Sequence, residues 1–273
     1  MSKTIIDSSS DSINFKELSH YKELFWMLAL RDFKIRYAQT LLGVLWALIQ
    51  PAATILILYM VFGRFAQVET GNVHHILFTA VGLLPWTYFS YVMQNSGNSI
   101  IAAQAMVKKV YFPRIIIPVS KALVGLIDFG INALIVIFLM LFLQQDLSVN
   151  VWALPFFIII GVLVSLGVGI WLSALTIRFR DFQYVVPFMV QIGLYLTPTA
   201  YPSEFAIKQL PEWASYLYFL NPMVGIVEGF RWSILDCQAP HNLSYLSFTV
   251  AFLLFISSLY YFKKIDGKIA DIV

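Results

Sequence analysis

Three long stretches of this chain carry no lysine or arginine, and this feature restricts its possible folds more than any other. They cover residues 65–107, 122–177 and 232–262. Each is long enough for one or two helices of about 20 residues, the length that crosses the hydrocarbon core of a bilayer. Only 12% of all residues are charged, against about 25% in an ordinary soluble domain. The sequence therefore predicts an all-α membrane protein.

Apolar runs predict six transmembrane helices. The expected spans are 42–63, 75–97, 115–143, 152–176, 184–200 and 244–262. The third run is longer than a bilayer requires, which is typical of a tilted helix. We therefore expect one transmembrane domain, residues 42–262, between a cytoplasmic N-terminal segment, residues 1–41, and a cytoplasmic tail, residues 263–273.

The distribution of basic residues predicts the orientation. With the N-terminus inside, 15 of the 18 lysines and arginines fall in the inner connections and tails. Basic residues accumulate on the cytoplasmic side of membrane proteins, so both termini are expected in the cytoplasm. The polar first residues contain no apolar run with a cleavage site, and no secretory signal is expected.

The connection between the last two spans is too apolar for a free loop. Residues 213–235 are largely apolar but are interrupted by Asn221 and Pro222. A proline ends one helix and permits another to begin. We predict a re-entrant helical pair on the outer side, a form tolerated where protein or water satisfies the backbone. The alternative is a seventh, kinked span, which would place the basic C-terminal tail outside against the charge rule.

The segment before the first span predicts an amphipathic interface helix over residues 15–38. It ends in a charged cluster of Arg31, Asp32, Lys34 and Arg36. Asp32 and Arg36 are spaced to pair along one helix face. The basic residues are candidates to bind an anionic lipid headgroup or substrate. The alternative is a simple anchor on the cytoplasmic face.

The second inner connection is a candidate docking site for a cytoplasmic protein. A short helical stretch leads into Lys108, Lys109, Tyr111, Phe112 and Arg114. Exposed aromatic side chains with a basic rim are typical of protein interfaces. The alternative is an ordinary interfacial turn with an aromatic belt.

The fourth predicted span has a face of small residues. Gly161, Ser165, Gly169 and Ser173 recur every four positions. This pattern lets helices approach closely. It predicts a packing role, with a neighbour either in this chain or in a second copy.

Aromatic residues within the spans are candidate channel-lining groups. Five of them lie deeper than the expected interfacial belts: Trp46, Tyr59, Phe89, Tyr91 and Tyr195. Their flat faces bury large apolar areas, and tyrosine keeps a polar end. The alternative assignment is interfacial anchoring or packing.

Few groups suit catalysis or metal binding. Asp128 stands alone in the third span, with Asn132 one turn later. A charge at that depth suggests function, although hydrogen bonding between helices is the simpler role. Adjacent His74 and His75 supply too few ligands for a metal. The chain has no phosphate-binding loop, metalloprotease motif or hydrolase nucleophile motif, so no bound cofactor or metal is expected.

Several blocks of sequence resemble the membrane subunits of polysaccharide-export ABC transporters, which include the O-antigen (Wzm-type), capsule and teichoic-acid exporters. The similar blocks are LALRDFKIRYAQTLLGVLWALIQP at 28–51, VGLLPWTYFS at 81–90, VKKVYFPRIIIPVS at 107–120, RFRDF at 178–182 and LNPMVGIVEGFRW at 220–232. They cover nearly the whole chain in the same order.

The resemblance implies a homodimeric permease in the bacterial inner membrane that works with two cytoplasmic ABC ATPase subunits, which would use the ATP. It implies export of an undecaprenyl-diphosphate-linked polysaccharide through a channel between the two copies, in contact with membrane lipids and without any nucleic acid. Arg31, Lys34 and Arg36 would guide the lipid diphosphate. The segment Lys108 to Arg114 would follow or overlap the helix that couples to the ATPase.

Other functions remain open at this stage. The similar blocks do not separate O-antigen export from capsule or teichoic-acid export. A membrane-embedded glycan-transfer enzyme would need acidic or basic catalytic groups, for which Asp128, Glu228 and Arg231 are the available residues. A drug or lipid exporter of the same superfamily is disfavoured by the amphipathic N-terminal helix and its charged end.

Overall fold

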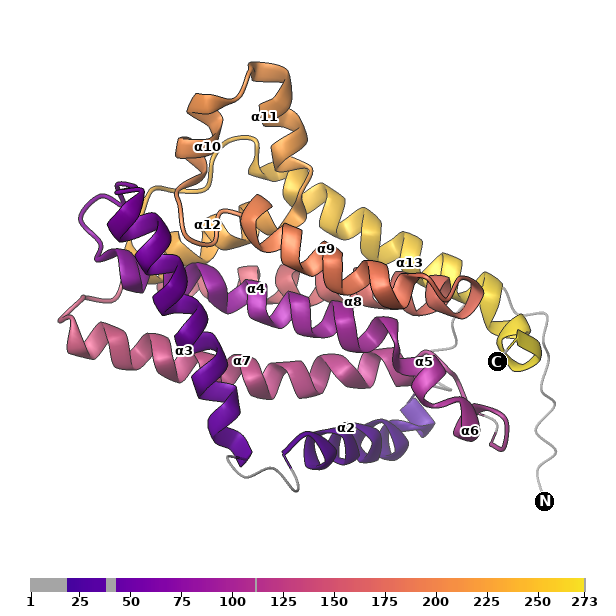
Figure 1. Cartoon of the computed structure of the whole chain (residues 1–273). Helices are drawn as coiled ribbons and strands as arrows, with labels where there is room; N and C mark the ends of the chain where they lie inside the picture. Colours follow the sequence, from indigo (N-terminus) through magenta and orange to yellow (C-terminus); the bar gives the residue numbers. More distant parts are fainter. Residues whose placement is uncertain (1–18, 38–42, 111, 273) are drawn as a thin grey trace.

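The computed structural model describes residues 19–37, 43–110 and 112–272, and every regular element in these ranges is helical (Figure 1). The helices are α2 (Lys22–Tyr37), α3 (Trp46–Leu58), α4 (His75–Gly97), α5 (Ser99–Ala102), α6 (Gln104–Val107), α7 (Ile116–Phe142), α8 (Leu154–Arg178), α9 (Phe182–Leu196), α10 (Ser203–Gln209), α11 (Glu212–Phe219), α12 (Pro222–Leu235) and α13 (Ser244–Ile272). Short 3-10 turns cover Gly43–Leu45 and Val149–Ala153, and a π-helical segment, Tyr59–Phe65, continues α3.

Within the described residues, five helical stretches are long and apolar enough to cross a membrane: Trp46–Phe65, His75–Gly97, Ile116–Phe142, Val149–Arg178 and Ser244–Asp266. They correspond to five of the six predicted spans. The remaining span, expected at 184–200, is represented by α9, an apolar helix of only 15 residues.

The early end of α9 has a local cause. Thr197 has left the helical conformation and is extended, with φ −92° and ψ 139°. It precedes Pro198, whose ring disfavours the helical conformation in the residue before it. The apolar run alone suggested a helix that continues to residue 200. Because the backbone is extended at Thr197, the helix ends before that point.

The centre of the molecule is built around α4 and α8. In α4, 78% of the apolar stretch is buried, compared with 44% in the α8 stretch and 17–22% in the other three. α8 packs against both α4 and α13. At Gly167 of α8, a Cβ atom would lie 2.8 Å from the backbone nitrogen of Phe255 in α13. The absence of a side chain there permits the close approach of the two helices.

The small-residue face of α8 packs within this chain. Gly161, Ser165, Gly169 and Ser173 are all buried. Gly169 lies against Ser96 of α4, where a Cβ would approach the Ser96 Cβ to 2.8 Å. The predicted packing role is therefore confirmed, and the neighbour that the sequence left open includes α4 of the same chain.

The break predicted at Asn221 and Pro222 is also confirmed. α11 ends at Phe219 and α12 begins at Pro222. The Asn221 side chain caps the new helix by accepting a hydrogen bond from the backbone N–H of Met223 at 3.0 Å, and proline is well suited to the first helical position. In Figure 1, α10 and α11 project from the bundle, whereas α12 lies within it.

Candidate functional site

Three of the apolar helices carry polar residues at helical spacing. Residues three, four, seven or eleven positions apart share one face of a helix. α4 carries Thr87, Ser90, Tyr91, Gln94 and Asn95; α3 carries Gln50 and Thr54; α7 carries Lys121, Asp128 and Asn132. The fold turns these three faces toward a common space, and α2 closes one side of it with Asp32 and Arg36.

The space enclosed by these faces is a cavity of about 610 Å³. It is half-open and runs along the helices rather than across them. Lys121 and Asn132, both in its wall, lie about 16 Å apart along the axis of α7. A smaller cavity of about 310 Å³ shares Arg36, Ala47 and Gln50 with it and adds Gly43 and Trp46. A cavity with polar walls over this length is unusual between apolar helices, because burying polar groups without solvent there costs free energy.

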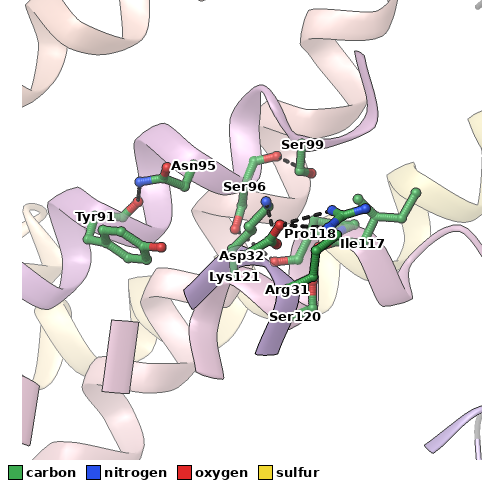
Figure 2. Close-up of polar contacts among 10 residues, drawn as sticks. All are labelled: Arg31, Asp32, Tyr91, Asn95, Ser96, Ser99, Ile117, Pro118, Ser120 and Lys121. Atoms are coloured by element: carbon green, nitrogen blue, oxygen red, sulfur yellow. Dashed lines mark hydrogen bonds and ion pairs between the residues drawn. The ribbon is translucent and has the colours of Figure 1, made fainter. Parts of the chain in front are cut away.

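Asp32 of α2 is the first of two carboxylates that join α2 to α7. Its Oδ2 lies 2.6 Å from Lys121 Nζ, and its Oδ1 lies 2.9 Å from Arg31 Nη2. Figure 2 shows Asp32 between these two cations. The Asp32 and Lys121 side chains are both largely buried, at 11% and 15% exposed. The pair is therefore shielded from solvent screening.

Asp128 of α7 is the second carboxylate, and it bonds with Arg36 of α2. The Arg36 guanidinium also lies over the ring of Tyr91, with Cζ 4.6 Å from the ring centroid. The pairing expected between Asp32 and Arg36 along α2 is thus replaced by bonds from both residues to α7. α2 contributes one acid and one base, and α7 contributes the complementary base and acid.

A hydrogen bond fixes the relative position of α4 and α7 beside the ion pairs. Ser96 Oγ donates to the carbonyl oxygen of Pro118 at 2.8 Å, a carbonyl near the start of α7 (Figure 2). Asn95 Nδ2 donates to the Tyr91 carbonyl at 2.8 Å. Asn95, which lines the cavity, is therefore held in a defined position.

The three basic residues proposed to guide an anion have different environments. The Arg36 side chain is 35% exposed and that of Arg31 is 46% exposed, and both bond with aspartates. Lys34 is exposed. Only Arg36 lines the cavity, so the structure does not bring the three into one binding site.

The five candidate channel residues are likewise separated. Tyr91 lines the large cavity and Trp46 the small one. Phe89 is only 8% exposed and packs against Trp86 in the core, outside both cavities. Tyr59 is half-buried beside His74 and His75. Tyr195, 56% exposed, lies on α9 away from both cavities.

The predicted docking segment needs one correction. Phe112 is 3% exposed and packs with Ile117 and other apolar side chains, so it is not an exposed anchor. Lys108 and Lys109 are exposed, and Val110, 58% exposed, is the apolar residue beside them. Arg114 bonds with Asp266 near the end of α13. Tyr111 lies outside the described residues.

Glu228 and Arg231, the two charged residues of α12, are both buried and have separate sets of partners. The Glu228 carboxylate accepts hydrogen bonds from Ser203 Oγ, Ser244 Oγ and the backbone N–H of His241. Every oxygen of this acid is thus occupied by a neighbouring element.

Arg231 is bonded to backbone rather than to an acid. Its guanidinium donates to the carbonyl oxygens of Phe78, Tyr201 and Thr199, at 3.3, 3.2 and 2.7 Å. It also lies 3.6 Å from the centroid of the Phe78 ring. Arg231 therefore ties α12 to α4 and to the segment after α9, which is a structural arrangement rather than a catalytic one.

Reasoning from sequence missed most of the cavity wall. The polar stripes of α3 and α4, including Gln50, Thr54 and Thr87, were available as a signal because their spacing follows the helical period. Lys121 and Asp32 carried no such signal, since nothing in the sequence shows that they meet. Among the described residues, no group of three His, Cys, Asp or Glu side chains is placed to hold a metal.

Comparisons with known proteins give a consistent result. A sequence profile of the ABC-2 type transporter family matches residues 23–235. The O-antigen export system permease protein RfbA of Klebsiella pneumoniae is 30% identical over 266 residues, covering 96% of this chain and all of that protein.

Two further relatives extend the similarity. The RfbA permease of Myxococcus xanthus is 27% identical over 79% of this chain and 82% of its own length. The polysialic acid transport protein KpsM of Escherichia coli is 26% identical over 89% of this chain and 94% of its own length. The match to each relative spans most of both proteins.

Proposed function

Because this chain belongs to the ABC-2 type transporter membrane family, we propose that it is the permease subunit of an ATP-driven polysaccharide exporter, with O-antigen as the cargo. The observation that carries the proposal is similarity over the full length of an O-antigen export permease. The family membership that the sequence resemblance predicted is thus confirmed. The cargo is the part that we propose.

In this proposal, α9 is a short sixth span, and α11 and α12, which flank the break at Asn221 and Pro222, form the re-entrant pair on the outer side. Both termini lie in the cytoplasm, and the membrane is the bacterial inner membrane. Two copies of the chain form the channel, and a separate ATPase binds on the cytoplasmic side, where Lys108 and Lys109 are exposed. The polysaccharide arrives on a lipid diphosphate.

The polar cavity supports a transport role. Bonded polar groups that extend about 16 Å along α7 line a half-open space between otherwise apolar helices. Such a space suits a hydrophilic chain that must cross the bilayer, whereas a purely structural bundle would fill it with apolar side chains.

The test is genetic complementation combined with purification. In cells deleted for the gene, the wild-type chain is expected to restore polysaccharide at the cell surface only when its ATPase partner is present. The chain should copurify with that ATPase and should not hydrolyse ATP alone. Polymer export that proceeds without any nucleotide-binding partner would contradict the proposal.

The enzyme alternative makes a different prediction. If the chain transferred glycans, Glu228→Gln would remove a catalytic group and abolish product formation in a purified system. We instead expect lipid-linked glycan to remain chemically unchanged by the purified chain, since each Glu228 oxygen is already bonded to protein. Mass spectrometry of the glycan before and after incubation distinguishes the two functions.

A further inference from the structure

We propose that the cavity between α2, α3, α4 and α7 binds a segment of uncharged polyhydroxyl chain, about two to three sugar units long, and selects against polyanionic polymers. This inference rests on the proposed function and specifies the chemical class of the cargo. It is carried by the charge distribution and length of the cavity.

The charges in the cavity wall are balanced and already paired. Among the described lining residues, the acids are Asp32 and Asp128 and the bases are Lys121 and Arg36. Each acid bonds with one of these bases. An anionic ligand must therefore break an ion pair and face a released carboxylate, which is costly in a low dielectric.

Beyond the pair of Arg36 and Asp128, the described wall is neutral. Toward the middle of the span it presents Thr54, Thr87 and Asn132. Asn132 Nδ2 donates to Thr87 Oγ1 at 3.3 Å, while its side-chain oxygen, although buried, accepts no hydrogen bond from the described residues. Asn132 and Thr87 thus bring amide and hydroxyl groups to the cavity wall, and groups of this kind both donate to and accept from the hydroxyl groups of a sugar.

The shape agrees with a chain rather than a single headgroup. The wall extends about 16 Å along α7 from Lys121 to Asn132 and about 12 Å along α4 from Asn95 to Thr87. A polymer with a carboxylate on every sugar would need cations at regular intervals over this length. In the described part of the wall, both cations lie beside the two aspartates, and the other polar groups are amides and hydroxyls, which serve both as donors and as acceptors.

The test uses the full-length wild-type chain in phosphatidylcholine nanodiscs. Two probes are titrated: mannotriose, which is neutral, and a trimer of sialic acid, which has one carboxylate on each sugar. Saturation-transfer NMR reports the binding of each. We expect mannotriose to bind at least about tenfold more tightly, because the sialic acid trimer meets uncompensated carboxylates.

Two variants probe the walls. Asn132→Leu keeps the number of side-chain heavy atoms but removes the hydrogen-bonding groups, and it should weaken mannotriose binding about fivefold or more. Asp128→Asn releases Arg36 from its carboxylate, so binding of the sialic acid trimer should become about fivefold tighter or more. Asp146→Asn, which removes an exposed acid outside the cavity, is the matched control and should change neither affinity.

Equal affinities for the two probes, tighter binding of the sialic acid trimer, or no saturable binding of either would overturn the inference. So would a response to Asp146→Asn as large as that to Asp128→Asn. Export in cells is read separately: a polyanionic polymer carried by this chain would refute the selectivity and leave the exporter function intact. If the wild-type chain supported no ATPase-dependent polysaccharide export in cells, the exporter function itself would be refuted.

Discussion

At the scale of single residues, the packing around α12 depends on two buried charges that do not bond with each other. Glu228 holds the starts of α10 and α13, while Arg231 holds α4 and the segment 197–201. Hydrogen bonds to charged groups contribute about 1.5–3 kcal/mol each. One helix, α12, therefore fixes the positions of several others through two side chains.

Gly82 tests this arrangement without altering a charge. A Cβ atom at Gly82 would collide with the Arg231 guanidinium and lie 2.5 Å from the carbonyl oxygen of Thr199. We expect Gly82→Ala to lower the free energy of unfolding by about 1–3 kcal/mol through overpacking. Thermal unfolding in detergent measures the change.

Gly130→Ala is the matched control, because a Cβ at Gly130 meets nothing within 4 Å. In a helix this substitution should be neutral or stabilising by up to about 1 kcal/mol. Equal loss of stability in both variants would show that Gly82 does not make room for Arg231.

At the scale of elements, the reciprocal ion pairs between α2 and α7 are the main attachment that the sequence could not reveal. They supplement the apolar contacts of Leu28, which packs with Ile100 and Ile117. Since each helix provides one acid and one base, a shift of α2 along α7 would bring like charges together. The pairs therefore define the register of α2 on the bundle.

A charge exchange measures this attachment. Asp32→Lys should place two cations opposite each other, and Lys121→Asp should place two acids there, so each single variant is expected to be less stable. The double variant should recover part of the loss, with a coupling free energy of about 0.5–3 kcal/mol. A double-mutant cycle of thermal unfolding provides the measurement, and strictly additive effects would show that the pair does not hold α2.

The spans and their helical class followed from apolar runs, because a segment without charges has few alternatives in a bilayer. The break at Pro222 was predictable for the same local reason that α9 ends early: proline restricts the residue before it. The burial of Phe112 and the ion pair between Asp32 and Lys121 were not predictable from the sequence. Both depend on how distant segments pack, which the local sequence does not encode.

At the scale of the whole molecule, the burial pattern divides the bundle into an inner and an outer part. α4 is largely enclosed by its neighbours, whereas α3 and α9 leave large apolar side chains exposed, such as Leu56, Ile57 and Phe188. In the proposed dimer, these faces would meet lipid or the second copy of the chain. The cavity lies between the buried α4 and the exposed α3, at the boundary of these two parts.

Cys237, the single cysteine in the chain, tests the proposed orientation. It follows α12 on the side assigned to the exterior, so a membrane-impermeant maleimide should label it in intact cells whose outer membrane is permeabilised. Burial raises the pKa of the Cys237 thiol, with Arg231 opposing the shift. The reactive thiolate is therefore scarce at neutral pH, and labelling should accelerate as the pH rises.

The exposed neighbour Gln238 provides the control. In a Cys237→Ser background, the cysteine of Gln238→Cys should be labelled faster at neutral pH than Cys237 is in the wild type. Its labelling rate should also rise at a lower pH than the labelling rate of Cys237. Labelling of either cysteine only in inverted vesicles would contradict the orientation, and equal pH profiles would contradict the burial of Cys237.

The ion pair between Arg36 and Asp128 also constrains how the sequence can change during evolution. Position 36 and position 128 are 92 residues apart in the chain but share one ion pair. Loss of one partner removes an ion pair that joins two distant segments, and this costs stability. Such a pair can therefore be replaced without loss only when both positions change, for example when the two charges are exchanged. Among descendants of a common ancestor, the amino acids at these two positions are expected to covary.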